Sequence, residues 1–340
     1  MRIVVGFDQH RGQIAFDALD TTTGEVSRGR IRPADRLGFR RWLGRFEGEQ
    51  IEAALEATTG WRFMVEELVA VGAVVHLAEP AETSALRGPK KRAKTDLKDA
   101  RHLRELLQAS RVPESWIAPG WVLELRSKVR LRHTLVVQRG EWQQRIQAQL
   151  YHHGVERRRG LLDGEERRAW LERLELPDAG RRQLDVALAM VDAVDGQLGP
   201  LDRELRALAR RQPGCRALQA HFGIGELTAV AILAELGDCR RFSSARQAVR
   251  YAGLDITVSE SDRKRAPGRL SRQGPADVAL GALRGGPGRA ALAPVARPRL
   301  LPAGRRPAGR QPRLPGGRPQ AAPARLPHLS ELGEEALQPA

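Results

Sequence analysis

The chain has 340 residues, of which 41% are hydrophobic, and a formal net charge of +16. This length is sufficient for two or three domains, while the longest apolar stretch, residues 68–78, is too short to span a bilayer. The segment IVVGF follows Met1 directly and is strand-like, unlike the apolar core of a signal peptide. Cys215 and Cys239 have neither C-x-x-C nor zinc spacing. We therefore expect a cytoplasmic protein with two buried thiols and no membrane partner.

The positive charge is concentrated in one segment. Residues 278–330 contain 10 arginines and no Asp, Glu or Lys. The rest of the chain has a net charge of only about +6, which does not by itself indicate a polyanionic partner. Local basic clusters must therefore support any argument for nucleic acid. The two clusters are Lys90, Lys91, Arg92 and Lys94 in GPKKRAK, and Arg263, Lys264 and Arg265 in SDRKRAP.

Residues 1–120 have the pattern of a mixed α/β domain. The segments RIVVGFD, QIAFDAL and EVSRGRI alternate in the manner of strands and predict an antiparallel three-stranded meander. There follow a helix over 36–46, a buried strand in QIEAALEAT, a helix in WRFMVEELVAVG, a strand in AVVHLAE and a helix over 93–109. A meander followed by alternating helices and strands is the element order of the ribonuclease-H-like fold. We predict a domain of that class, RuvC-like, over 1–120.

Residues 121–212 are predicted to be almost wholly helical. Apolar residues recur at steps of three and four from Leu184 to Leu208, which is typical of an amphipathic helix with coiled-coil character. The pattern fits a packed helical hairpin and a dimerisation arm equally well.

Residues 213–275 are predicted to form a mainly α-helical domain. In HFGIGELTAVAILAELGD, Gly223 and Gly225 precede an apolar helix, an arrangement that resembles a helix-hairpin-helix element whose N–H groups can meet a phosphate. RFSSARQAVRYAGL is helical in pattern, whereas DITVSESDRKRAPGRLSRQG is polar, basic and loop-rich. Residues 276–328 combine frequent prolines with no apolar periodicity, so we expect disorder there. A helical pattern returns within 329–340.

Four acidic residues stand at positions where this fold would gather them. Asp8 ends the first strand, Glu56 ends the central strand, and Asp96 and Asp99 share one face of a helix. Like charges so placed need a positive partner, which a lysine or a divalent metal can supply. Mg²⁺ prefers carboxylate oxygens, and two ions about 3.5–4 Å apart assist phosphoryl transfer. The set predicts a two-metal Mg²⁺ site, with the basic run 87–94 beside it where a phosphate backbone would enter.

Each of these features also has a purely structural explanation. An aspartate at a strand end is commonly a turn or cap residue, and Glu56 can be a partly exposed edge residue. Asp96 can interact with the positive end of a helix dipole, and Asp99 can pair with Arg92 or His102. The basic run can be a solvated loop. The metal site requires instead that all four carboxylates meet at one pocket.

Several motifs resemble those of a known family. GFDQH, LEATTGW and KTDLKDA, with GIGELTAVAILAELGD, YAGLDITVSESD and GRLSRQG, resemble the DEDD-type insertion-sequence transposases, which include Piv-like DNA invertases and RNA-guided bridge recombinases. The resemblance covers about 1–275 and the last dozen residues. It implies that Asp8, Glu56, Asp96 and Asp99 are metal ligands. It also implies that Ser261, in SESD, attacks DNA and forms a covalent phosphoserine link.

The resemblance further implies partners and a location. The family excises and reinserts a circular element by strand exchange, and in its studied members a non-coding guide RNA pairs with donor and target DNA. The target sequence would then be held by the RNA. A nucleoid-associated homo-oligomer, dimer or tetramer, is expected, with the helical middle region contributing to assembly. Ser259 and Ser271 are nearby alternatives to Ser261, which is preferred on the family pattern alone.

The chain departs from the family pattern after GRLSRQG. The family continues with a helical segment that contains aromatic residues, whereas 278–330 has neither aromatic residues nor isoleucine. A frameshift near codon 276, restored near 328 in a GC-rich gene, predicts such a composition. A basic disordered insert that binds RNA or DNA is the alternative. A frameshift would leave an inactive remnant that only binds nucleic acid.

Two other enzyme classes are alternatives to the serine recombinase. A RuvC-like junction nuclease would use the same carboxylates with water as the nucleophile and would not need Ser261. A tyrosine recombinase is disfavoured, because neither Tyr151 nor Tyr251 lies in an R…H-x-x-R…Y arrangement.

Overall fold

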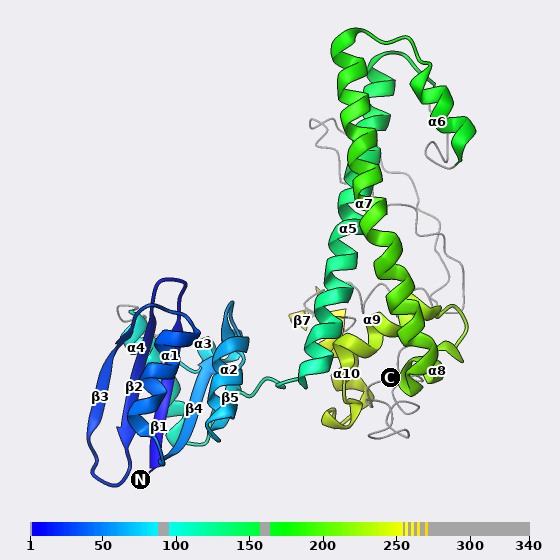
Figure 1. The fold of residues 1–340 in the computed structure, drawn as a ribbon. Coiled ribbons are helices and arrows are strands. Elements are labelled where there is room, and N and C mark those ends of the chain that lie inside the picture. The colour runs from blue at the N-terminus through cyan, green and yellow to red at the C-terminus, as the bar shows by residue number, and fades with distance from the viewer. Residues whose placement is uncertain are drawn as a thin grey trace. The chain divides into compact units, whose positions relative to one another are not determined.

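The computed structural model describes residues 2–87, 95–156 and 164–253 and the backbone of four short strands between 256 and 270. The expectations for 276–328 and 329–340 lie outside the described residues. So do the structural positions of Lys90, Lys91, Arg92, Lys94 and Arg263. The chain divides into two compact units, Met1–Ile117 and Ala118–Ala340 (Figure 1).

The N-terminal unit is built on a five-stranded sheet with the strand order β3-β2-β1-β4-β5. The antiparallel meander comprises β1 (Arg2–Gln9), β2 (Ile14–Asp20) and β3 (Val26–Ile31). The next two strands, β4 (Gln50–Glu56) and β5 (Val74–Ala78), extend the sheet parallel to β1. The predicted meander and the mixed α/β class are confirmed.

Four α-helices connect or follow these strands. They are α1 (Arg36–Leu43), which continues into the 3-10 turn η1 (Gly44–Phe46), α2 (Trp61–Ala70), α3 (Pro80–Ala85) and α4 (Asp96–Gln108). The predicted helices correspond to α1, α2 and α4. The sequence analysis missed α3, because six residues are too few to show a helical period.

One face of the sheet carries the main core of this unit. The helices α1 and α2 lie over this face (Figure 1), and apolar side chains of β1 and β4 pack against them. The ring of Phe7 meets those of Phe39 and Trp42 edge to face, with centroids 5.3 and 5.1 Å apart. Such aromatic pairs add to the stabilisation from buried area, so this core fixes β1 against α1.

The other face of the sheet is covered by α4. Val4 of β1 and Ala54 of β4 pack there with leucines of α4. Because side chains alternate along a strand, Asp8 and Glu56 lie on the same face as Val4 and Ala54. The alternation that builds the two cores therefore turns both strand-end carboxylates toward α4.

Gly6 allows α4 to approach β1 closely. A Cβ at this position would lie 2.1 Å from the carbonyl oxygen of Ala100 and 2.6 Å from the backbone nitrogen of Arg104. Both are helix backbone atoms, so a side chain here could be accommodated only by moving α4. The contact between the glycine and the helix sets the distance between Asp8 and the aspartates of α4.

A buried ion cluster also holds α4 to the sheet. Asp17 of β2 has a fully buried side chain, and its carboxylate accepts hydrogen bonds from Arg104 of α4 and Arg28 of β3. The side chain of Arg104 is 7% exposed and that of Arg28 is 47% exposed. Removing a buried charge from water is costly unless it is paired, so Asp17 favours the register in which Arg104 reaches it.

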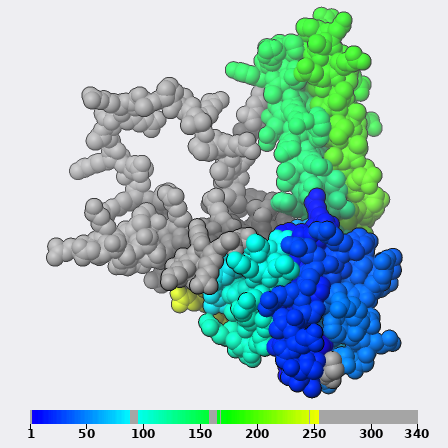
Figure 2. All heavy atoms as spheres, turned by 90° about the vertical axis from the view of Figure 1, so that its left-hand side faces the viewer, coloured from blue at the N-terminus to red at the C-terminus, as the bar shows by residue number. Residues whose placement is uncertain are grey.

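The second unit begins with a long helical hairpin. The helices α5 (Gly120–His152) and α7 (Asp178–Arg211) run side by side, with α6 (Glu165–Glu172) between them in sequence (Figures 1 and 2). Ion pairs join Arg132 to Asp202 and Arg139 to Asp195, as expected for antiparallel helices. The packed hairpin is thus confirmed, and dimerisation through it stays a prediction. None of the described helices has a stretch long and apolar enough to cross a membrane.

Shorter elements pack at one end of the hairpin. They are α8 (Pro213–Gln219), α9 (Glu226–Leu236), the 3-10 turn η2 (Cys239–Arg241) and α10 (Ala245–Tyr251). The segment described as loop-rich also contains two short antiparallel strand pairs, which the sequence analysis did not predict. β6 (Ile256–Thr257) pairs with β9 (Arg269–Leu270), and β7 (Glu260–Ser261) pairs with β8 (Lys264–Arg265). Such strands are too short to show the alternation by which sequence reveals a strand.

Both cysteine thiols are expected to be unreactive in the folded protein. Burial raises the pKa of Cys215 to about 12 and that of Cys239 to about 11. At pH 8 only about one Cys215 thiol in ten thousand would then be the reactive thiolate. Titration with a disulfide reagent should detect no fast thiol in the native protein and two in denaturant. A fast-reacting thiol in the native protein would contradict the burial of these side chains.

Candidate functional site

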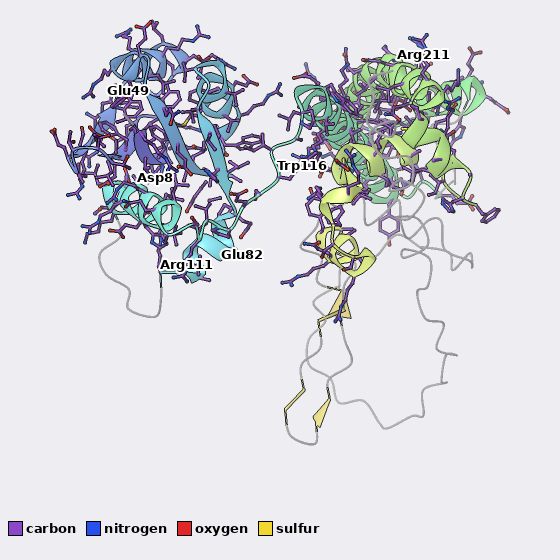
Figure 3. The ribbon with its side chains drawn as sticks, turned by 90° about the horizontal axis from the view of Figure 1, so that it is seen from below. Asp8, Glu49, Glu82, Arg111, Trp116 and Arg211 are labelled. Atoms are coloured by element: carbon purple, nitrogen blue, oxygen red, sulfur yellow. The ribbon has the colours of Figure 1, made fainter. Side chains whose placement is uncertain are left out.

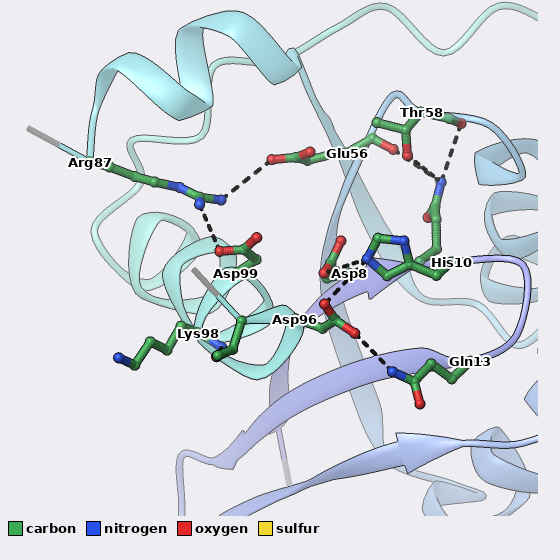
Figure 4. A network of polar contacts seen from close by, with 11 residues as sticks. Asp8, His10, Gln13, Glu56, Thr58, Arg87, Asp96, Lys98 and Asp99 are labelled. Atoms are coloured by element: carbon green, nitrogen blue, oxygen red, sulfur yellow. Dashed lines mark hydrogen bonds and ion pairs between the residues drawn. The ribbon is translucent and has the colours of Figure 1, made fainter. Parts of the chain in front are cut away.

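The four predicted carboxylates line one cavity. It has a volume of about 630 Å³ and contains Asp8, Glu56, Asp96 and Asp99 in its wall (Figure 4). The side-chain view from below shows Asp8 among the strands with α4 beside it (Figure 3). Residues from two strands and one helix thus meet as the sequence predicted.

The backbone explains why these side chains meet. β1 and β4 are neighbouring parallel strands, and Phe7 lies opposite Leu55, so the next residue of each strand leaves the sheet at the same edge. Thr95 caps α4 by accepting a hydrogen bond from the backbone N–H of Lys98. This cap starts the helix at Asp96 and puts both of its aspartates in the first turn, near the strand ends.

Gln9 ties the two strand ends together. Its side-chain amide nitrogen lies 3.3 Å from the carbonyl oxygens of both Glu56 and Thr58 and 3.2 Å from the hydroxyl of Thr58. The donor is on β1 and its acceptors are at and beyond the end of β4. These hydrogen bonds limit the separation of the two strand ends that carry Asp8 and Glu56.

Asp8 and Asp96 share a basic neighbour, His10. Its Nε2 lies 3.2 Å from Oδ2 of Asp8 and 3.5 Å from Oδ1 of Asp96. The amide of Gln13 donates to the other oxygen of Asp96 at 2.8 Å. Asp8, His10 and Asp96 can each offer one ligand atom, and these atoms lie within 4.8 Å of one another.

Glu56 and Asp99 share a different basic neighbour, Arg87. One terminal nitrogen of its guanidinium donates to Oδ1 of Asp99 at 2.6 Å, and the other lies 3.9 Å from Oε1 of Glu56. The alternative pairing of Asp99 with His102 does not occur, since the His102 ring bonds to the carbonyl of Thr83. Pairing with Arg92 falls outside the described residues.

The electrostatic environment of Asp8 reflects this crowding. Burial raises the pKa of the Asp8 carboxyl above its usual value, and the charge of His10 opposes the rise. The negative charges of Asp99 and Asp96 raise it further. Water is thus partly excluded where negative charge collects, and a bound cation would be stabilised there.

The other predicted site residues lie in the second unit. Ser261 ends β7 and is opposite Lys264 of β8, so it stands near the turn of a short hairpin. Lys264 and Arg265 form β8. The side chains of these residues are not described, and the catalytic assignment of Ser261 remains a prediction.

The glycine turn has the predicted backbone form. Gly223 has a φ of +80°, which favours glycine, and Gly225 is the N-cap of α9. Glu226, the first residue of α9, pairs with Arg210 at 2.7 Å. A carboxylate already stands at this helix end, so a phosphate contact through Gly223 and Gly225 stays a prediction.

Sequence reasoning did not predict that His10 and Arg87 contact the four carboxylates. His10 was part of the quoted motif GFDQH but received no role, because a lone histidine after a strand gives no spacing signal. Arg87 was included only in the basic run thought to meet a phosphate backbone. Its guanidinium instead contacts carboxylates from two separate elements, a contact that local sequence cannot reveal.

Two family models of known proteins match segments of this chain. A family model described as "Transposase" and named DEDD_Tnp_IS110 matches residues 5–153, and one described as "Transposase IS116/IS110/IS902 family" matches 215–279. These two segments are those of an IS110/IS116 family transposase. The first match contains all four carboxylates of the cavity, and the second contains Ser261 and the glycine turn.

A curated transposase also matches part of this chain. The "Transposase for insertion sequence element IS1111A" of Coxiella burnetii is 31% identical over 80 residues, which are 24% of this chain. The aligned segment is 22% of that relative's length.

Proposed function

We propose that this chain is a DNA transposase that cuts and exchanges strands of an insertion sequence through a ribonuclease-H-like, RuvC-type site. The observation that carries the proposal is the convergence of Asp8, Glu56, Asp96 and Asp99 on one cavity. The strand order and the family matches support the same reading.

The residues of the cavity fit divalent metal ions such as Mg²⁺. Four carboxylates supply hard oxygen ligands, two from strand ends and two from the first turn of α4. The core between α4 and the sheet and the Thr95 cap hold these elements in place. Two bound ions would activate the attacking oxygen and stabilise the leaving oxygen of a phosphodiester. The protein's part is to hold the carboxylates at fixed positions and to keep the cavity partly free of water.

We propose Ser261 as the nucleophile. Its hydroxyl oxygen would bond to phosphorus while the bond from phosphorus to a deoxyribose oxygen breaks, and the serine proton would end on the released sugar hydroxyl. One phosphodiester replaces another, so the strand can be rejoined by the reverse reaction without an external energy source. This property separates a recombinase from a nuclease that uses the same carboxylates.

The partners proposed for this reaction are nucleic acids and further copies of the chain. Donor and target DNA would lie along the basic run 87–94, which precedes Asp96 in the sequence, and along β8. A non-coding RNA of the element would select them. The helical hairpin offers a surface for a dimer or tetramer. The resemblance to the family and the local basic clusters support these proposals, and a location at the nucleoid is proposed on the same grounds.

An assay for a covalent adduct between the protein and DNA tests this function. The full-length protein would be incubated with Mg²⁺, RNA transcribed from the flanking sequence and labelled junction DNA, then analysed on a denaturing gel. We expect an adduct that is lost in Ser261→Ala, is retained in Ser259→Ala and falls at least about 100-fold in Asp96→Asn.

The other outcomes identify the competing functions. An adduct that persists in Ser261→Ala would contradict the choice of nucleophile. Free cleaved ends without an adduct would indicate a junction nuclease. Binding without cleavage would indicate an inactive remnant, and resequencing the gene across codons 276–328 would then show whether a frameshift is the cause.

A further inference from the structure

Two basic side chains of the cavity wall, His10 and Arg87, contact the four acidic ones. His10 lies between Asp8 and Asp96, and Arg87 spans Glu56 and Asp99 (Figure 4). The carboxylates are therefore divided into two pairs, each with its own basic partner. The two halves of the cavity differ in how they can receive a cation.

The half with Asp8 and Asp96 can bind a cation without losing its basic partner. An uncharged imidazole is itself a metal ligand through its free nitrogen. Neighbouring ligands around an ion with bonds of 2.1 Å lie about 3 Å apart in octahedral geometry. The His10 Nε2 is 3.2 and 3.5 Å from the two carboxylate oxygens, so the three groups need only small shifts to surround one ion.

The half with Glu56 and Asp99 cannot bind a cation while it keeps its basic partner, Arg87. Arginine keeps its charge at all ordinary pH values and has no acceptor or ligand atom. Its terminal nitrogens lie 2.6 Å from Asp99 and 3.9 Å from Glu56, within the space that an ion bridging these carboxylates would take. A cation can enter this half only if the guanidinium leaves.

The terminal nitrogens of Arg87 contact carboxylates, whereas its Nε does not. Its Nε is buried and has no hydrogen-bond partner among the described residues, and its side chain remains 29% exposed. A phosphate group can accept two parallel hydrogen bonds from one guanidinium. Asp99 accepts only one hydrogen bond from Arg87, through its Oδ1. A DNA phosphate at the cavity mouth would thus offer Arg87 a better-matched partner.

We propose that Arg87 is an internal counter-ion that keeps the Glu56–Asp99 half free of divalent cations until a DNA phosphate draws it away. In the absence of DNA the protein binds one ion, at Asp8, His10 and Asp96. The inference rests on the proposed function in one respect, that the cavity takes divalent cations. It makes loading of the second ion depend on the bound substrate.

Mn²⁺ titration of the full-length protein tests the proposal, with free Mn²⁺ followed by electron paramagnetic resonance. We expect one tightly bound ion per chain in the wild type and two in Arg87→Met. Arg87→Gln, which keeps a donor for Asp99 without the charge, should also bind two. Arg11→Met is the matched control, since Arg11 lines the same cavity but pairs with none of the four carboxylates, and it should bind one.

Two further measurements separate the halves of the site. His10→Ala should weaken the single ion of the wild type at least about tenfold. Addition of junction DNA to the wild type should produce the signal of a magnetically coupled Mn²⁺ pair, which Mn²⁺ on DNA alone does not give. Circular dichroism would establish that each variant is folded.

The possible failures are distinguishable. Two ions in the DNA-free wild type, or one in both folded Arg87 variants, would overturn the counter-ion role and leave the proposed function standing. No bound ion in the wild type or in any variant would overturn the metal site on which the proposed function rests, and the counter-ion role with it.

Discussion

Replacing Gly6 with alanine should destabilise the N-terminal unit by about 3 kcal/mol or more, because the new Cβ would overlap backbone atoms of α4. The helix oxygen of Ala100 would be only 2.1 Å away, and backbone atoms cannot rotate aside as a side chain end can. Relief of the overlap requires α4 to move away from β1. The aspartates of α4 would then move away from Asp8, so cation binding should fall together with stability.

Urea unfolding of the full-length protein, followed by circular dichroism and by Mn²⁺ binding, measures both effects. Gly44→Ala is a suitable control, because nothing lies within 4 Å of the Cβ position and its φ is −58°. A surface change of this kind should alter stability by less than about 1 kcal/mol. Equal stabilities for the two variants would show that α4 does not depend on the close approach at Gly6.

Replacing Arg104 with methionine should cost about 3 kcal/mol, whereas Arg28→Met should cost less than about 1 kcal/mol. Both arginines donate to the buried carboxylate of Asp17, but Arg104 is nearly buried and Arg28 is half exposed. Loss of Arg104 leaves a buried charge with only one partner at the sheet edge. Loss of Arg28 leaves the buried pair intact and removes a partner that water can replace.

The pair of variants is matched, since each removes one arginine from the same acceptor. Urea midpoints of the two proteins, with equal slopes, give the comparison directly. Similar losses in the two variants would contradict the view that the buried pair anchors α4. A larger loss in Arg28→Met would show that the ion pair between β2 and β3 contributes more to stability than the ion pair between β2 and α4.

The shape of the candidate site explains why its carboxylates were predictable. Each of the four stands at an element end that the sequence marks clearly, either by an apolar strand that stops or by a helix whose cap follows a basic run. The relative position of β1 and β4 follows from the parallel connection through a helix. The ends of the two apolar strands and the parallel pairing of β1 with β4 were thus sufficient to place Asp8 and Glu56 together.

His10 and Arg87 could not be assigned in the same way. Neither belongs to a periodic pattern, and the partners of Arg87 lie at the end of β4 and in α4. A guanidinium can reach many positions, so which carboxylate it meets depends on how α3 and α4 lie beside the sheet. The short strands around Ser261 were missed for a related reason, because two residues carry no alternation.

The amino-acid sequence alone determined the meander, the main helices, the two helical arms and the four acidic positions, since these depend on periodicity and caps over a few neighbouring residues. The tertiary structure decided how closely α4 approaches β1 at Gly6, how Asp17 is neutralised and which basic group faces each pair of carboxylates. These features depend on contacts between residues tens of positions apart. Such contacts are set by packing and charge balance, which no local stretch of the chain contains.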